Sequence, residues 1–320
     1  MIFQNLFYKN IGISLRFNSS LIPKLKNQKQ LKYFKSRQNT SLYYNKRIWI
    51  WVGVVVSLSG IYYVNHLERV PISNRTRFMN ISLEQELAIA QSQFNQLMHQ
   101  YKHQILPDYH PTTKFVRKVA SDLIKVSGMT GVNWEVFVIQ DKETNAFVLP
   151  GGKIFVFTGL LPIAQDADGL AAVLGHEIAH QVARHGAEKL VWLSGIFVAR
   201  FLISIIFDPG VLFTTLFLKF GLEMPFSRTC EKEADYIGLL LMSKACYDPH
   251  AAVNMWERMK LVTGSETSEY LSTHPSNDNR ILKIKEWMRE AEQQRDESNC
   301  SHLAHSYDSF KRLSPSIRFS

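Results

Sequence analysis

One segment places the strongest limit on how this chain can fold. Leu174–His185, LGHEIAHQVARH, sets three histidines and a glutamate among apolar residues. Ionisable side chains are costly to bury unless they are paired, hydrogen-bonded or bound to a metal. Either this segment faces water, or something inside the protein holds these side chains.

His176, Glu177 and His180 form the pattern H-E-x-x-H. Residues four apart on an α-helix differ in direction by about 40°, so both imidazoles can bind one ion. Glu177 points about 100° away from His176, beside the ion, where it can take a proton from the attacking water. His185 lies on the far side of a straight helix, so we interpret it as a surface residue or a support for a ligand. The alternative is an amphipathic helix with two ordinary histidines.

A catalytic zinc site needs a third protein ligand and an open fourth position. The candidate ligand is Glu231, in the segment Ser227–Leu239, SRTCEKEADYIGL. Asp235 lies on the same helical face one turn later and can hydrogen-bond the N–H of a ligating imidazole. Apolar neighbours indicate that one side of this helix is packed, which favours a site over the alternative of a solvated acidic residue.

The net charge of +9 over 320 residues is confined to the N-terminus. Residues 1–47 contain ten Lys or Arg and no acid, which leaves 27 basic and 28 acidic residues in the remainder. No basic face remains to neutralise phosphates, which argues against nucleic acid as a partner. A basic, acid-free N-terminus is typical of a mitochondrial presequence, and a disordered basic tail is the alternative.

The segment Ile48–Val64, IWIWVGVVVSLSGIYYV, is uncharged and near the minimum length for crossing a bilayer. Lys46 and Arg47 precede it, so the positive-inside rule places its start in the matrix and the following chain in the intermembrane space. A buried helix of a soluble domain is the alternative. Residues 190–222 are also apolar, but two further spans would put Arg200 in mid-bilayer, which is costly. We expect a buried or membrane-apposed helical hairpin there.

The remaining pattern predicts an α+β fold, mainly helical, with a small antiparallel sheet. The β-rich runs WEVFVIQD and AFVLPGGKIFVFT predict the sheet, with a hairpin at residues 150–152. Helices are predicted at about 82–105, 112–126, 166–190, 226–245, 249–262 and 277–294. Cys230, Cys246 and Cys300 are too scattered for a thiolate metal site. They are either ordinary thiols or include a Cys246–Cys300 disulfide.

Four segments in this order resemble the HtpX and CaaX-prenyl-protease superfamily of gluzincin metallopeptidases. They are NAFVLPGGKIFVFTGLL (145–161), HEIAH (176–180), SRTCEKEAD (227–235) and STHPSNDNRI (272–281). The resemblance covers roughly residues 106–288. A presequence and a single leading span make the chain most similar to the Oma-type peptidases of the mitochondrial inner membrane.

The resemblance implies a zincin-like domain with one Zn²⁺ per chain, held by His176, His180 and Glu231. It implies that Glu177 is the general base and later proton donor. It also places His274 near the oxyanion, with Arg280 as a supporting residue. Zincin substrates add as a strand to an edge of the sheet, and the corresponding residues here are Asn145, Ala146, Phe147 and Val148.

The predicted organisation has four parts. They are a presequence or basic matrix segment at 1–47, a transmembrane helix at 48–64, a metallopeptidase domain at 65–295 and a polar tail at 296–320. The family further implies membrane-protein substrates, inner-membrane lipid as a partner, protein quality control and stress-induced cleavage of the inner-membrane dynamin-like GTPase. A homo-oligomer is left open.

Two rival interpretations remain. One is a catalytically inactive, membrane-anchored interaction protein with a structural zinc. Structural sites are usually closed by four ligands, mostly Cys and His, whereas three ligands and an intact Glu177 favour catalysis here. The other is an HtpX-like protease of another membrane, which depends on the nature of the N-terminus.

Overall fold

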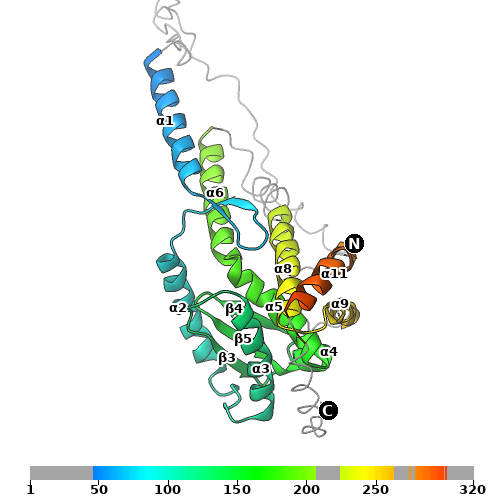
Figure 1. Ribbon diagram of the computed structural model, residues 1–320. Helices are drawn as coiled ribbons and strands as arrows, with labels where there is room; N and C mark the ends of the chain where they lie inside the picture. Colours follow the sequence, from blue (N-terminus) through cyan, green and yellow to red (C-terminus); the bar gives the residue numbers. More distant parts are fainter. Residues whose placement is uncertain (1–45, 207–223, 263–273, 275–277, 299, 301–320) are drawn as a thin grey trace, which may run out of the picture. The chain divides into compact units, whose positions relative to one another are not determined.

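The computed structural model describes residues 46–206, 224–262, 274, 278–298 and 300 (Figure 1). It divides after Gly60 into two units, which are described separately. In the first unit the described part is Lys46–Gly60, most of helix α1 (Lys46–Asn65). Among the described helices, α1 is the one long and apolar enough to cross a membrane, and none of its residues is buried. This helix contains the predicted span, while the rest of the predicted presequence lies outside the described residues.

The second unit begins with a two-stranded antiparallel hairpin, β1 (Leu67–Arg69) and β2 (Thr76–Phe78). Helix α2 (Leu83–Tyr101) follows, and a reciprocal capping box between Ser82 and Gln85 fixes its start as the sequence predicts. Helix α3 (Pro111–Val126) begins at a proline, whose missing N–H and restricted φ suit the first helical turn.

The main sheet has the strand order β3-β5-β4, with β3 at Glu135–Ile139, β4 at Ala146–Leu149 and β5 at Lys153–Phe157. Strands β4 and β5 form the predicted antiparallel hairpin. Strand β3 pairs parallel to β5, however, so the sheet is mixed and not wholly antiparallel. The loop after β3 explains this, because it carries the chain past the end of β5, where Asp141 O accepts hydrogen bonds from Gly159 N at 2.8 Å and Thr158 Oγ1 at 2.9 Å.

Alternate side chains of the sheet face two different helical layers, as the two-residue period of a strand requires. One face packs with α3 and α5, and the other packs with α2. The first face carries Val136, Val138, Ala146, Val148, Ile154 and Val156. The second carries Phe137, Ile139, Phe147, Leu149, Phe155 and Phe157. Both faces are covered, which confirms the mainly helical α+β class.

In the described residues, further helices follow a short 3-10 turn, η3 (Thr158–Leu160). They are α4 (Leu161–Ala164), α5 (Ala167–Val182), α6 (His185–Ile206), α8 (Met224–Lys244) and α9 (His250–Val262), and α11 (Asp278–Glu297) completes the described fold. Helix α5 packs against α3, α4, α8, α9 and β4, and Figure 1 shows it between the sheet and the C-terminal helices. It is therefore the central helix of the domain.

The helices around residue 190 differ from the predicted ones. The single helix predicted at about 166–190 is wrong, because the chain breaks between α5 and α6 at Ala183 and Arg184, where Arg184 has a φ of 50°. Helix α6 carries the first part of the apolar segment 190–222, and its residues from Trp192 to Phe201 are largely exposed. The second part, from 207, lies outside the described residues.

Cys246 and Cys300 form a disulfide, one of the two alternatives that the sequence left open. It joins the end of α8 to the end of α11. Since α8 carries Glu231 and α11 carries Arg280, the bridge links the two helices that complete the candidate site.

Candidate active site

Helix α5 buries the costly side chains of the H-E-x-x-H segment. Every residue of this helix except Asp168 and His180 is buried, and His176 and Glu177 are only 1% and 3% exposed. Asp166 caps the helix by accepting a 2.8 Å hydrogen bond from Gly169 N. His176 and Glu177 therefore do not face bulk water and His180 is only partly exposed, and the protein supplies partners for them from inside.

The first partner is helix α8, which approaches α5 at a pair of glycines. A Cβ added to Gly175 would lie 2.9 Å from the carbonyl oxygen of Gly238. A Cβ on Gly238 would lie 2.8 Å from His176 N. A side chain at either position would therefore keep the two backbones apart. The close crossing brings Glu231, two turns earlier on α8, to the face of α5 that carries the histidines.

The candidate ligands His176, His180 and Glu231 lie 3.1–3.5 Å apart, and each imidazole lies nearest a different oxygen of the Glu231 carboxylate. His176 Nε2 lies 3.1 Å from His180 Nε2 and 3.4 Å from Glu231 Oε2, and His180 Nε2 lies 3.5 Å from Glu231 Oε1. Zinc binds N and O ligands at about 2.0–2.1 Å, which puts tetrahedral ligand atoms about 3.3 Å apart. The three side chains are thus spaced to share one tetrahedral ion.

His274 joins this group from the far end of the chain. Its Nδ1 lies 3.0 Å from both carboxylate oxygens of Glu231 and 3.4 Å from His176 Nε2. Its Nε2 lies 3.6 Å from Glu177 Oε1. From residue types alone His274 would be a loop residue before a proline. The structure instead places it among the candidate ligands, with every ligand atom of the four within 4.8 Å of the others.

In the metal-free site, Glu231 and His180 have the protonation states that a cation needs, whereas His176 holds a proton. Burial opposes ionisation of Glu231, but hydrogen bonds with His176 and His274 hold its pKa well below the ordinary value. Burial and Arg280 lower the pKa of His176, while hydrogen bonds with Asp235 and Glu231 outweigh them and raise it to about 9. Burial, with the neighbouring His176, lowers the pKa of His180. An ionised carboxylate and a neutral imidazole are the forms that zinc binds, so binding must release the proton of His176.

Asp235, the expected partner of a ligating imidazole, lies against His176. Its Oδ1 lies 2.9 Å from His176 Nδ1 and accepts a 2.5 Å hydrogen bond from Arg280 Nη2. The Arg280 guanidinium also lies over the Trp256 ring, 3.5 Å from its centroid. A hydrogen bond of this kind fixes the tautomer and orientation of a ligating imidazole. Asp235 and Arg280 thus lie together against His176.

Of the two sequence interpretations of His185, a surface residue or a support for a ligand, the structure excludes the first and favours the second. His185 is buried, with its Nδ1 2.9 Å from His180 Nδ1, and it is neither on the surface nor opposite the site. The helix break at Arg184 turns it back toward His180. Neither helical periodicity nor residue type signalled that break.

A second group of potential ligands lies behind the first: His185, Glu188 and Cys230. Glu188 is bonded to Arg75 at 2.7 Å and to Arg77 at 3.0 Å, so its charge is already compensated. Burial raises the pKa of the Cys230 thiol, which opposes the thiolate that a metal requires. We therefore assign this group to a polar network and not to a metal site.

The candidate substrate strand lies at an edge of the sheet. Strand β4 pairs with β5 on one side, is last in the strand order of the described residues, and packs against α5. It runs from Ala146 to Leu149, one residue later than the predicted Asn145–Val148, although Asn145 O still accepts a 3.0 Å hydrogen bond from Phe157 N.

The fold and this cluster define a metallopeptidase of the helical zincin type. Residues 111–288 match Peptidase family M48. The chain is 50% identical over 256 residues to "Mitochondrial metalloendopeptidase OMA1" of Schizosaccharomyces pombe, which covers 79% of this chain and 76% of the relative. It is 36% identical over 268 residues to the Saccharomyces cerevisiae protein of that name, covering 78% and 77%. The human relative is 34% identical over 262 residues, covering 76% of this chain and half of the relative.

The chain belongs to peptidase family M48, as a metalloendopeptidase of the Oma type. The mitochondrial names of its relatives and the candidate span α1 together fit a protein of a mitochondrial membrane.

Proposed function

We propose that this enzyme is a zinc-dependent endopeptidase of the mitochondrial inner membrane, with one span and its body in the intermembrane space. Its substrates would be membrane proteins, in quality control and in stress-induced processing, including the inner-membrane dynamin-like GTPase that the resemblance implies. The convergence of His176, His180 and Glu231 from α5 and α8, with Glu177 beside them, carries the catalytic part of this proposal.

The three ligating groups would hold zinc, which supplies a Lewis acid that polarises the scissile carbonyl and promotes ionisation of the attacking water. Glu177 accepts the proton of that water as the new C–O bond forms. It then donates the proton to the amine nitrogen as the C–N bond breaks. Its burial keeps bulk water from competing for that proton.

His274 is suited to stabilise the oxygen of the tetrahedral intermediate. Its imidazole lies against Glu231 on one side, and its Nε2 is 3.6 Å from Glu177 Oε1 on the other. A donor in this position acts where negative charge develops. Asp235 and Arg280 act through His176, which they hold in one orientation.

The edge of β4 would bind the substrate as an added antiparallel strand. Backbone hydrogen bonds of this kind are independent of sequence, and alternate side-chain pockets would supply the preference. Because β4 packs on α5, a strand added there would lie beside the helix that carries Glu177.

Cleavage of a model substrate tests this function. Purified protein in detergent is expected to cut casein and a membrane-anchored reporter, to stop after chelation and to recover on addition of zinc. Cleavage that persists in metal-free protein, or no cleavage at any zinc content, would contradict the proposal. Cutting of casein with no cutting of any membrane-anchored reporter would contradict only the substrate class.

A further inference from the structure

We propose that His185 is a positioning residue for His180, and that the β1–β2 hairpin holds it in place through Arg75 and Glu233. This rests on the proposed role of His180 as a zinc ligand. His180 contacts His185, which contacts Glu233, and Glu233 in turn contacts Arg75. Each of these is a direct contact between side chains.

Hydrogen-bonding geometry assigns the protons along this path. His180 must keep its Nε2 free to bind a metal, so its proton sits on Nδ1. The atom facing that proton, 2.9 Å away, is His185 Nδ1, which therefore accepts. The proton of His185 then sits on Nε2, which donates to Glu233 Oε2 at 2.9 Å. One tautomer of each imidazole thus satisfies both contacts on this path.

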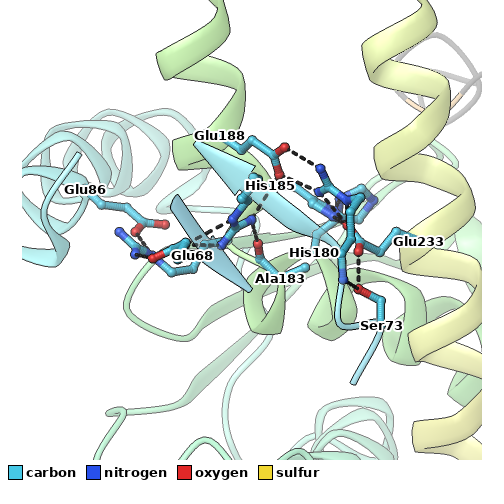
Figure 2. A network of polar contacts seen from close by, with 11 residues as sticks. Glu68, Ser73, Glu86, His180, Ala183, His185, Glu188 and Glu233 are labelled. Atoms are coloured by element: carbon cyan, nitrogen blue, oxygen red, sulfur yellow. Dashed lines mark hydrogen bonds and ion pairs between the residues drawn. The ribbon is translucent and has the colours of Figure 1, made fainter. Parts of the chain in front are cut away.

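The hairpin fixes Glu233 at the end of this path. Arg75 donates to Glu233 Oε2 from Nε at 2.9 Å and from Nη2 at 2.6 Å. The other carboxylate oxygen, Oε1, accepts from the hydroxyl of Ser73. Arg75 also forms two 2.7 Å hydrogen bonds to Glu188 of α6, so one guanidinium joins α6 to α8 (Figure 2). Burial of Glu233 and Glu188 strengthens these charged contacts.

The backbone between α5 and α6 explains why His185 can face His180. Arg184 adopts the left-handed region, with a φ of 50°, which is unfavourable for a residue with a Cβ. Its side chain is held by Glu86 at 2.8 Å and by Ile81 O at 3.0 Å. Arg77 of the hairpin also donates to Ala183 O at the break. Contacts from outside the two helices thus maintain the bend that points His185 at the ligand.

Each of the two candidate imidazole ligands thus has its own pair of residues that hold it in place. Asp235 and Arg280 hold His176, and His185 and Glu233 hold His180. Removal of such an outer partner typically costs 10- to 100-fold in metal affinity. His185 itself is outside the predicted ligand set and is expected to act only through His180.

The test measures zinc affinity of the full-length protein by competition with a chelating dye. His185→Phe keeps the ring but removes the acceptor, and it is expected to weaken zinc binding about 10- to 100-fold. His185→Asn places an amide oxygen near the position of Nδ1, so it is expected to recover most of the affinity. The matched control is His250→Phe, since His250 also pairs with a glutamate, Glu292 at 2.9 Å, but on an exposed surface. It is expected to bind zinc as the wild type does.

A structural role is separated from a positioning role by the melting temperature. If His185 positions a ligand, His185→Phe reduces the rise in melting temperature that zinc produces, beyond any change in the metal-free protein. Equal zinc affinity in His185→Phe and wild type, or no recovery in His185→Asn, would overturn the inference. A wild type that binds no zinc would instead overturn the proposed zinc site on which it rests.

Arg75 provides an independent check through a double-mutant cycle. Arg75→Gln is expected to weaken zinc binding less than His185→Phe, and the double variant should bind no more weakly than His185→Phe alone, because Arg75 acts through His185. Arg117→Gln is the control, since Arg117 forms an exposed ion pair with Asp108. Fully additive losses of affinity in the double variant would remove the hairpin from the path.

Discussion

Gly175 and Gly238 face each other where α5 crosses α8, and no side chain fits between them. A Cβ on Gly238 would lie 2.8 Å from the carbonyl carbon of Gly175, and one on Gly175 would lie 2.9 Å from Gly238 O. The obstructing atoms are backbone, so they cannot move aside as a flexible side chain would. This contact sets the helix separation at which Glu231 reaches the histidines of α5.

Gly238→Ala is therefore expected to push α8 away from α5. Overpacking of a closely packed contact typically costs about 1–3 kcal/mol, so the melting temperature should fall. Zinc affinity should fall as well, since Glu231 moves with α8. Both are measured on purified protein, by thermal unfolding and by dye competition.

The control for this substitution is Gly195→Ala on α6, where an added Cβ meets nothing within 4 Å. There alanine should be neutral or slightly stabilising, because it is the better helix former by up to about 1 kcal/mol. If Gly238→Ala melts and binds zinc as Gly195→Ala does, the separation of the helices does not depend on this glycine pair.

The local sequence pattern was enough to predict which side chains of the site share one face of a helix. The four-residue spacing of His176 and His180 and of Glu231 and Asp235 depends only on helical geometry. The β4–β5 hairpin followed from its Pro-Gly-Gly turn.

The features of the fold that the sequence did not predict depend on contacts between segments far apart in the chain. The parallel pairing of β3 with β5 is set by a loop that crosses the end of β5, which period-two alternation does not encode. The break at Arg184 is held by Glu86 and by the hairpin, so a continuous helix was the natural prediction. The surface interpretation of His185 was wrong for that reason, because it assumed a straight helix.

Substitution of the predicted ligands is expected to remove the metal. His180→Ala and Glu231→Ala should each lose most of the zinc, about one ion per chain in the wild type, because two remaining protein ligands hold it weakly. Elemental analysis after dialysis measures this. Glu257→Ala, which removes an exposed glutamate 3.7 Å from Lys285 Nζ, is the control and should keep full occupancy. Full occupancy in Glu231→Ala would exclude Glu231 as a ligand.

Glu177→Gln should keep the metal and lose the activity. The amide is nearly the same size as the carboxylate, so the buried site should be undisturbed, but it cannot accept a proton at neutral pH. General base catalysis typically contributes about 10²- to 10⁴-fold, and we expect the larger end because the same residue serves the leaving amine. The measurement is turnover of a membrane-anchored substrate at equal zinc content. More than about a tenth of wild-type activity would be too much for loss of a general base.

Membrane topology can be tested on isolated mitochondria. Lys46 and Arg47 precede the apolar part of α1, so the body should follow the span into the intermembrane space. Protease added after rupture of the outer membrane is expected to digest the body, while a matrix marker stays intact. Protection of the body until the inner membrane is opened would reverse this orientation.

Acid should weaken the network around the hairpin through Glu188. Burial opposes its ionisation, but hydrogen bonds from Arg75 and Arg77 outweigh burial and lower the pKa of Glu188 below its ordinary value of 4.5. A carboxylate with a depressed folded-state pKa contributes stability that is fully present above the unfolded pKa and is lost as the pH falls below it.

Glu188→Gln removes that contribution, so the metal-free variant should melt well below the wild type at pH 7. The gap should narrow steadily below about pH 4.5 as the wild-type carboxylate becomes protonated. Glu257→Gln, an exposed carboxylate, should show no comparable gap at any pH. A gap for Glu188→Gln that stays constant from pH 7 down to pH 3 would show that charge at this position does not stabilise the fold.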